Sequence, residues 1–184
     1  MSNNNLTSLR ALGDIKHILK LNASNNRLTK MLDFAPPANL EWVDYSKNQI
    51  TKIDRVQQNP YLKYLFLDEN KIQKIEKVQY NKSLIVLSLR ANQISKIENL
   101  DDMWLEELNI AENLITRITG LNKLQVLREL DLSENHIVKL SGLQDIKSLR
   151  FLNLSLNKIE KILQLQFIEQ LTLLTDLDFC FNPI

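Results

Sequence analysis

The sequence has few of the residues on which most catalytic and metal sites depend. Its 184 residues include one cysteine, two histidines and three glycines. A single cysteine cannot form an internal disulfide, and three glycines exclude a glycine-rich phosphate-binding loop. His17 and His136 lie far from each other and from Cys180, so neither a Cys–His nucleophile pair nor a zinc site can be assembled. We therefore expect no enzyme activity, no catalytic residues, no cofactor and no metal.

An excess of charge and a long apolar run are also missing. The 23 basic and 22 acidic residues give a net charge of +1. A nucleic-acid-binding protein usually shows a basic excess, so we do not expect nucleic acid as a partner. No apolar run approaches the about 20 residues that cross a membrane, and the first residues lack the pattern of a signal peptide. We expect a cytoplasmic protein without a membrane contact or a small-molecule substrate.

What the sequence does contain is a repeat. Apolar residues recur around an asparagine in the template L-x-x-L-x-L-x-x-N, which is typical of leucine-rich repeats. The asparagines from Asn4 to Asn182 are spaced by 22, 22, 22, 22, 21, 22, 22 and 25 residues. We therefore predict an α/β fold, a leucine-rich-repeat solenoid with a parallel concave sheet and short 3₁₀ or irregular convex segments.

The whole chain, 1–184, is predicted to be one array. It begins with a partial first repeat at 3–15, continues with eight strands, and ends in a truncated repeat at 184. The strands are predicted around Leu21–Ala23, Val43–Tyr45, Leu65–Leu67, Leu87–Leu89, Leu108–Ile110, Leu130–Leu132, Leu152–Leu154 and Leu177–Phe179. Pro36-Pro37 should make one convex crossing extended, and the long last interval should form helical turns near 163–173.

The repeated asparagine has a structural role in this fold. Its amide side chain can donate to and accept from the backbone groups that the turn buries, so the asparagines should stack as a ladder. The ladder is predicted at Asn26, Asn48, Asn70, Asn92, Asn113, Asn135, Asn157 and Asn182.

The outward positions of the strands form columns on the concave face. Three aromatic residues and a valine come together there beside acidic side chains, a combination that is typical of protein-binding sites. The alternative is that such aromatics only stiffen the sheet by packing across strands. The predicted protein-binding residues are Trp42, Tyr64, Phe66, Val86, Arg90, Glu107, Glu129, Asp131 and Phe151.

A basic residue stands four positions after each ladder asparagine up to Asn157. This basic column consists of Lys30, Lys52, Lys74, Lys96, Arg117, Lys139 and Lys161. It could meet an acidic partner. The simpler explanation, which we favour at the level of sequence, is that an exposed position between two buried residues suits a long basic side chain.

The last repeat stops before its convex half. Leu177, Phe179 and Ile184 should then face solvent as an apolar patch. Because a solenoid needs a cap over its last core layer, we expect a continuation of the chain or a partner to cover this end at Ile184.

The template and its irregularities resemble one family more closely than others. The carrying segments are 17–26, the double-proline segment 34–40, and 43–50, with the shortened repeat before Asn113 and the final Asn182-Pro-Ile184. The chain is similar here to the leucine-rich-repeat and guanylate-kinase-domain family, within the 22-residue class of intracellular and ciliary repeats. This resemblance implies a role in the axoneme of a cilium or flagellum, with microtubules nearby. It also implies a guanylate kinase-like domain after the repeats, which this chain does not contain.

The sequence thus leads to one hypothesis and its rivals. The hypothesis is a non-enzymatic protein-binding scaffold of a ciliary, axonemal or other microtubule-based cytoskeletal assembly, which docks partners through its concave face. The first rival is a regulatory subunit of a protein phosphatase 1-like enzyme. The second is the repeat region of a larger protein that carries a guanylate kinase-like domain.

Overall fold

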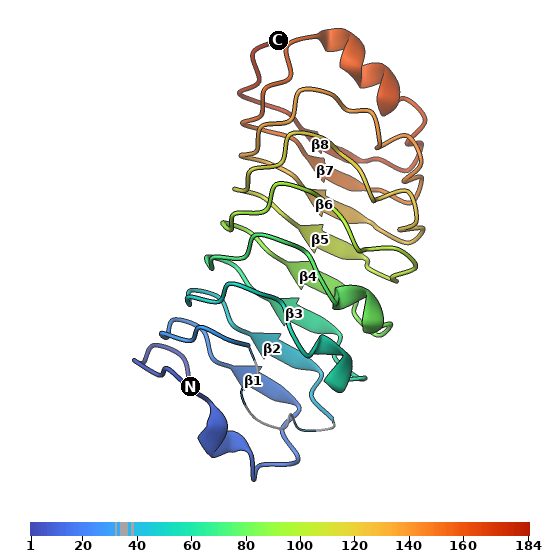
Figure 1. Cartoon of the computed structure of the whole chain (residues 1–184). Helices are drawn as coiled ribbons and strands as arrows, with labels where there is room; N and C mark the ends of the chain where they lie inside the picture. Colours follow the sequence, from blue (N-terminus) through green and yellow to red (C-terminus); the bar gives the residue numbers. More distant parts are fainter. Residues whose placement is uncertain (32, 34–36, 38) are drawn as a thin grey trace.

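The chain forms a stack of repeats joined by one parallel sheet, from β1 at the bottom of Figure 1 to β8 at the top. The structure, a computed structural model, describes residues 1–31, 33, 37 and 39–184. All eight strands pair with their sequence neighbours, in the order β1 to β8. The predicted leucine-rich-repeat solenoid with little helix is confirmed.

The regular elements are short, as the 22-residue period requires. The strands are β1 (Lys20–Asn22), β2 (Trp42–Asp44), β3 (Tyr64–Phe66), β4 (Val86–Ser88), β5 (Glu107–Asn109), β6 (Glu129–Asp131), β7 (Phe151–Asn153) and β8 (Asp176–Asp178). The 3₁₀ helices are η1 (Arg10–Leu12), η2 (Val56–Gln58), η3 (Val78–Tyr80) and η4 (Ile162–Phe167). Each strand lies one residue before its predicted position. The third predicted residue still pairs with the next repeat, as Ala23 N–H does with Asp44 O at 2.8 Å, but the turn begins there.

Each strand from β1 to β7 buries its central residue, and in all of these except β4 the two residues beside it are exposed or half-exposed. Leu65, for example, is fully buried and lies in register with Val43 and Leu87 on the neighbouring strands. Alternation with a period of two places one face of each strand in the core and the other outside. Because the repeats stack in register, the buried residues form one continuous core along the solenoid.

The convex crossings differ in structure along the chain. Residues 56–58 and 78–80 form 3₁₀ helices, whereas the described crossings between β5 and β7 consist of turns. The long last interval contains η4, six residues of 3₁₀ helix in the region where helical turns were predicted. The prediction of an extended crossing at Pro36-Pro37 rests on residues 34–36 and 38, which lie outside the described residues.

The last repeat leaves its core layer open. Every residue of β8 is exposed, whereas the central residue of each other strand is buried. Leu177 and Ile184 are exposed as predicted, but Phe179 is only half-exposed because it packs against the preceding core layer. The most exposed side chain of the end is Phe181.

Candidate functional site

The ladder asparagines bind the backbone of two successive repeats. Asn48 shows the pattern: its Nδ2 donates to Tyr45 O at 2.9 Å within its own turn, and to Ala23 O at 3.0 Å in the preceding repeat. Its Oδ1 accepts the N–H of Leu28, also in the preceding repeat, at 2.9 Å. Each amide therefore supplies hydrogen-bond partners to buried backbone N–H and C=O groups that the turn leaves unpaired. The same arrangement recurs at Asn26, Asn70, Asn92, Asn113, Asn135, Asn157 and Asn182.

The ladder also shows how the repeats tolerate changes of length. Asn113 accepts from Ile94 N–H, 19 residues back, and Asn182 accepts from Ile159 N–H, 23 residues back. The corresponding separation for Asn48 is 20 residues. The missing residue and the extra residues are thus accommodated in the convex crossings, and the asparagine positions stay aligned.

A feature missed in the sequence is the conformation of the residue before each ladder asparagine. That residue has a positive φ, between 51° and 59°, in every repeat. The nine residues are Asn3, Asn25, Lys47, Glu69, Ala91, Glu112, Glu134, Leu156 and Phe181. This left-handed conformation is unfavourable for most side chains. Because the residue type at this position varies, the sequence does not reveal the left-handed conformation.

Two further buried asparagines were not predicted. Asn59 and Asn81 follow the 3₁₀ helices η2 and η3 and are almost fully buried. Asn81 Nδ2 donates to Asn59 O at 2.8 Å, so it joins two neighbouring convex crossings. Their spacing of 22 residues is visible in the sequence and could have revealed this second, shorter stack.

The predicted columns of the concave face are present in the structure. The first outward position runs in register through Trp42, Tyr64, Val86, Glu107, Glu129 and Phe151. The second outward position places Phe66, Ser88, Asn109 and Asp131 side by side. Because neighbouring strands lie about 4.8 Å apart, successive side chains of a column are in contact range.

The predicted aromatic group is less exposed than the sequence suggested. Trp42 and Phe66 are half-buried, and their ring centroids lie 5.6 Å apart with planes tilted by 49°. Tyr64 is exposed, but Val86 is only 8% exposed, so the prediction of an exposed Val86 is wrong. The physical reason is the size of its side chain. Val86 lies in register with Tyr64 and diagonal to Phe66, and the larger rings cover its short side chain.

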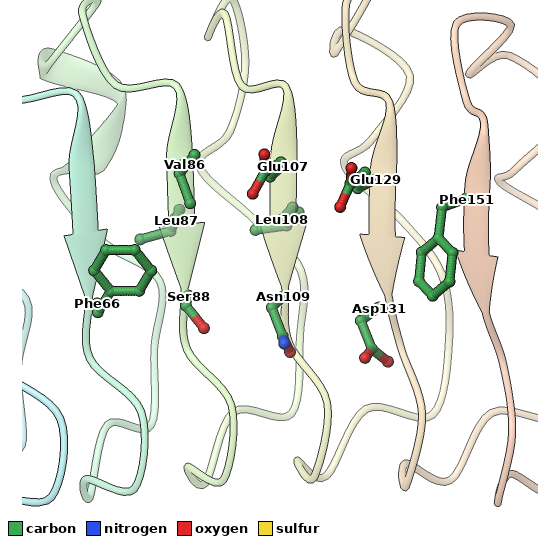
Figure 2. A pocket seen from close by; sticks show the side chains of 10 residues that line it. All are labelled: Phe66, Val86, Leu87, Ser88, Glu107, Leu108, Asn109, Glu129, Asp131 and Phe151. Carbon is green, nitrogen blue, oxygen red and sulfur yellow. The ribbon is translucent and has the colours of Figure 1, made fainter.

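The centre of the concave face contains a hollow of about 220 Å³. Figure 2 shows Phe66 on β3 and Phe151 on β7 leaning toward the middle from opposite sides, with the carboxylates of Glu107, Glu129 and Asp131 between them. The hollow is therefore lined by Phe151 on one side, by Phe66 of the aromatic group on the other, and by the three carboxylates between them. It brings together six of the nine predicted protein-binding residues and omits Trp42, Tyr64 and Arg90.

The electrostatics of the hollow favour a positive ligand group. Burial raises the pKa of Glu107, and the neighbouring carboxylates of Glu129 and then Glu106 raise it further. Among the described residues, no basic side chain forms an ion pair with Glu107, Glu129 or Asp131. The hollow thus holds negative charge without a counter-charge.

Two basic residues near the hollow have acidic partners. Arg128 pairs with Glu106 at 3.1 Å. The guanidinium of Arg90 pairs with Glu112, so its charge is compensated although we predicted it as a binding residue. The backbone N–H of Arg90 donates to Asp68 at 2.9 Å, but burial nevertheless raises the pKa of Asp68.

The basic column lies on a different surface. Its seven side chains are all exposed, and none of them takes part in an ion pair with another residue that the structure describes. Asp54, which follows Lys52 by two residues, pairs instead with Lys77 at 2.7 Å, and this bond lowers the pKa of Asp54.

The remaining reactive residues do not form a chemical site. In the described part of the chain, no group of three His, Cys, Asp or Glu side chains is arranged to bind a metal ion. Cys180 is exposed, and its hydrogen bond to Asp178 raises the pKa of the thiol. The helices within the described ranges are too short and polar to span a bilayer.

Comparisons with known proteins agree with this architecture. A family model described as "Leucine Rich repeats (2 copies)" matches residues 104–145. No curated protein matches the sequence.

Among solved structures, the chain is similar to an internalin, InlF, of Listeria monocytogenes, with 23% identity and a TM-score of 0.85 over 99% of this chain and 60% of that one. This chain thus spans about 60% of the length of that internalin. It is also similar to a chain of the LRIM1/APL1C complex, with 21% identity and a TM-score of 0.81 over 99% of this chain and 34% of that one. A third likeness is to the TLR13–ssRNA13 complex, with 24% identity and a TM-score of 0.76 over 95% of this chain and 27% of that one. These likenesses establish the leucine-rich-repeat fold, which is consistent with a scaffold for protein interactions.

Proposed function

We propose that this chain is a non-enzymatic scaffold that docks partner proteins on its concave face. The observation that carries the proposal is the hollow between Phe66 and Phe151, whose carboxylates have no basic partner among the described residues. An apolar contact at each side with an uncompensated charge between them is a binding surface for a polypeptide.

The chemistry of the hollow specifies the partner further. A lysine or arginine side chain of the partner would lie between Glu107 and Glu129 and relieve the repulsion between these two carboxylates. Apolar side chains of the partner on either side would contact Phe66 and Phe151. Arginine fits best, because its planar group binds carboxylates through two hydrogen bonds and stacks on aromatic rings.

Trp42 and Tyr64 extend the same surface toward the N-terminal end. Trp42 packs against Phe66, so the aromatic group is continuous with one side of the hollow. A partner that fills the hollow and continues along the strands would cover these two rings as well. The contact area would then consist of aromatic rings on both sides of a group of carboxylates.

The test uses variants that change the hollow without disturbing the core. Phe151→Ala combined with Glu129→Lys should abolish partner binding, because it removes one aromatic side of the hollow and reverses a charge. Both side chains are exposed and outside the core, so the fold should be kept. Trp104→Ala is the matched control, since Trp104 is 63% exposed and does not line the hollow. Each variant is compared with the wild-type chain by quantitative affinity capture followed by mass spectrometry, and its fold is checked by circular dichroism.

Proteins retained by wild type and by Trp104→Ala but lost with the double variant would be concave-face partners. Equal retention by all three chains would overturn the proposal. The double variant Trp42→Ala with Tyr64→Ala then measures how far the contact reaches: weaker binding places these rings inside the interface.

The cellular setting we propose is a ciliary, axonemal or other microtubule-based assembly. It is supported by the resemblance of segments 17–26, 34–40 and 43–50 to the guanylate-kinase-domain family. Fractionation of tagged protein from ciliated cells tests it. Retention in axonemes after salt washing agrees with a structural component, whereas release with a co-purifying phosphatase would favour the phosphatase-regulator alternative. The length of the native transcript tests whether a guanylate kinase-like domain follows the repeats.

A further inference from the structure

We propose that the basic column is a second docking surface, which binds an extended acidic segment of a partner protein. This inference is independent of the concave-face proposal, because it concerns other residues on another surface. It rests on the uniform sign of the column, on a trough that follows it, and on two apolar side chains inside that trough.

The uniform sign is not explained by exposure alone. The positions one and three residues after each ladder asparagine are exposed in the same repeats as the column. The first of these holds Arg27, Gln49, Lys71, Gln93, Leu114, His136 and Lys158, and the second holds Thr29, Thr51, Gln73, Ser95, Thr116, Val138 and Glu160. Only the position four residues after the asparagine is basic throughout. A need for a long solvated side chain would be met equally well by glutamate or glutamine.

A trough follows the column along the repeats. Three hollows of about 440, 510 and 570 Å³ are lined in turn by Lys74 with Lys96, by Lys96 with Arg117, and by Arg117 with Lys139. Neighbouring hollows share lining residues, so the three lie next to one another along four repeats, and this row of hollows is the trough. Among the residues that line it, Glu98 is the only carboxylate that faces these four bases.

The N-terminal part of the column differs from this central part. A separate hollow of about 530 Å³ holds five bases and two acids, namely Arg10, Lys30, Lys52, Arg55, Lys77, Asp33 and Asp54. Its two acids are paired: Asp54 with Lys77 at 2.7 Å and Asp33 with Arg10 at 3.9 Å. Among the described residues, Lys74, Lys96, Arg117 and Lys139 have no such acidic partner, and we place the docking surface along these four bases.

The trough suits a polypeptide better than a nucleic acid. Leu114 and Val138 line it and are 47% and 44% exposed, so an apolar side chain of a partner has two contacts among the cations. Single-stranded nucleic acids are bound largely by stacking of bases on aromatic side chains. None of the residues that line the three hollows is aromatic. Ser95 and Thr116 add hydroxyl donors that carboxylates can accept.

The size of the expected segment follows from the repeat spacing. Neighbouring repeats are about 4.8 Å apart along the sheet, so four bases in successive repeats extend over about 14 Å. An extended chain covers this length with four to five residues at about 3.3 Å each. A probe of about eight residues, mostly glutamate with two leucines, is therefore long enough. Its binding is measured by fluorescence anisotropy at about 0.1 M salt, where the Debye length is about 10 Å. A peptide with lysine in place of glutamate and a single-stranded oligonucleotide are measured beside it.

The decisive variant reverses two charges of the trough, Lys96→Glu with Arg117→Glu. We expect it to weaken binding of the acidic peptide by about tenfold or more. The matched control, Lys123→Glu with Lys147→Glu, changes the net charge equally at exposed positions that do not line the trough. It should leave the affinity within about twofold of the wild type, because distant surface charges are screened. Circular dichroism verifies that both variants fold.

Three outcomes would overturn the proposal. The acidic peptide does not bind, both charge variants weaken it equally, or the oligonucleotide binds more tightly and is the probe that Lys96→Glu with Arg117→Glu releases. Leu114→Ala with Val138→Ala separates the last case further, since it should weaken the leucine-containing peptide and leave the oligonucleotide unaffected. Phe151→Ala should change none of these affinities, so failure on the concave face and failure here are distinguishable.

Discussion

The central strand leucine is buried at the N-terminal end of the solenoid and exposed at the C-terminal end. Leu21 in β1 is 4% exposed, whereas Leu177, the corresponding residue of β8, is 41% exposed. The difference comes from the partial first repeat, whose Leu9 and Leu12 are buried against the core. At the other end, Phe181 remains on the surface. A repeat of this length therefore buries its leucine only when a neighbour lies on each side.

The backbone shows the same contrast. The N–H groups of Asn3 and Asn4 donate to Ser24 O and Asn25 O, so the turn after β1 has a partner on its outer side. The corresponding groups after β8 lie at the end of the sheet. In a repeat array, stability is the sum of the repeats and the contacts between neighbours. An end repeat then has about half of those contacts, and substitutions in the two settings should differ accordingly.

The largest difference is expected for the strand leucines. Leu130→Ala leaves a cavity in a fully buried layer and should lower the free energy of unfolding by roughly 2–5 kcal/mol. Leu177→Ala should cost less than about 1 kcal/mol, because much of the side chain is already in water. Urea denaturation followed by circular dichroism measures both. A large loss for Leu177→Ala would mean that the C-terminal end is covered in solution, and the comparison would fail.

The next effect is expected where two interior repeats come into direct backbone contact. Gly142 has φ +108°, and a Cβ atom there would lie 2.3 Å from Ile118 O. Gly142→Ala should therefore destabilise the protein by roughly 2–4 kcal/mol, since both strain and overlap must be relieved.

Gly120→Ala is the matched substitution, with φ +69° and a Cβ that would lie 2.8 Å from Ile97 O. It should cost less than Gly142→Ala in the same denaturation experiment. The opposite order would show that the interior repeats are less rigidly spaced than their contacts indicate.

The ladder asparagines provide a third comparison. Asn135 is 3% exposed, and its amide binds Ile110 O and Leu132 O at 3.0 and 3.1 Å. Asn135→Ala should cost roughly 1–3 kcal/mol, because buried backbone groups lose their partners. Asn182→Ala should cost less, because water can reach the half-exposed turn after β8. Thermal unfolding of the two variants checks the order, and equal losses would contradict it.

The smallest effect is expected for the carboxylate of Glu107 on the concave face. Burial and the neighbouring Glu129 raise the pKa of Glu107 in the folded state. A raised pKa means that the folded chain binds this proton more tightly, so the stability contributed by Glu107 falls as the pH rises through that pKa. Glu107→Gln should then unfold at a slightly higher temperature than wild type near neutral pH. The difference should vanish below about pH 4, where carboxylates are protonated.

Glu129→Gln sharpens this prediction. It removes the neighbouring charge, so the pKa of Glu107 should fall, as titration monitored by NMR would show. An unchanged pKa would mean that burial and Glu106 cause the shift without Glu129. Either result also bears on the hollow, because a basic partner is attracted only to carboxylates that remain ionised.

The sequence predicted most of the fold because its period determines which residues become neighbours. A spacing of 22 residues from Trp42 to Tyr64 and from Tyr64 to Val86 is enough to place them in one column, and the register agrees. The repeated asparagine always binds the backbone of the turn, and the strand leucines always fill the core. Their residue type therefore predicts where they lie in the repeat.

The rest depended on quantities that a repeat pattern does not contain. The burial of Val86 is set by the size of the side chains beside it, and the pairing of Arg90 with Glu112 by the reach of two long side chains across repeats. The left-handed residue before each asparagine escaped notice because residues as different as Ala91, Glu134 and Phe181 occupy that position. The trough along the basic column likewise needed coordinates, because depth cannot be inferred from spacing.

The asparagine ladder has a direction, and this bears on how the chain is made. Every residue that the side chain of Asn135 binds precedes it in the chain, either in its own turn or in the repeat before, and the same holds for Asn48 and Asn157. A ribosome releases the N-terminal repeats first, so each new asparagine emerges when the groups that it must bind already exist. The N-terminal repeats can serve as a template, and each later repeat can fold against them without waiting for the rest of the protein. Synthesis in this order would leave only the newest turn incomplete at any moment.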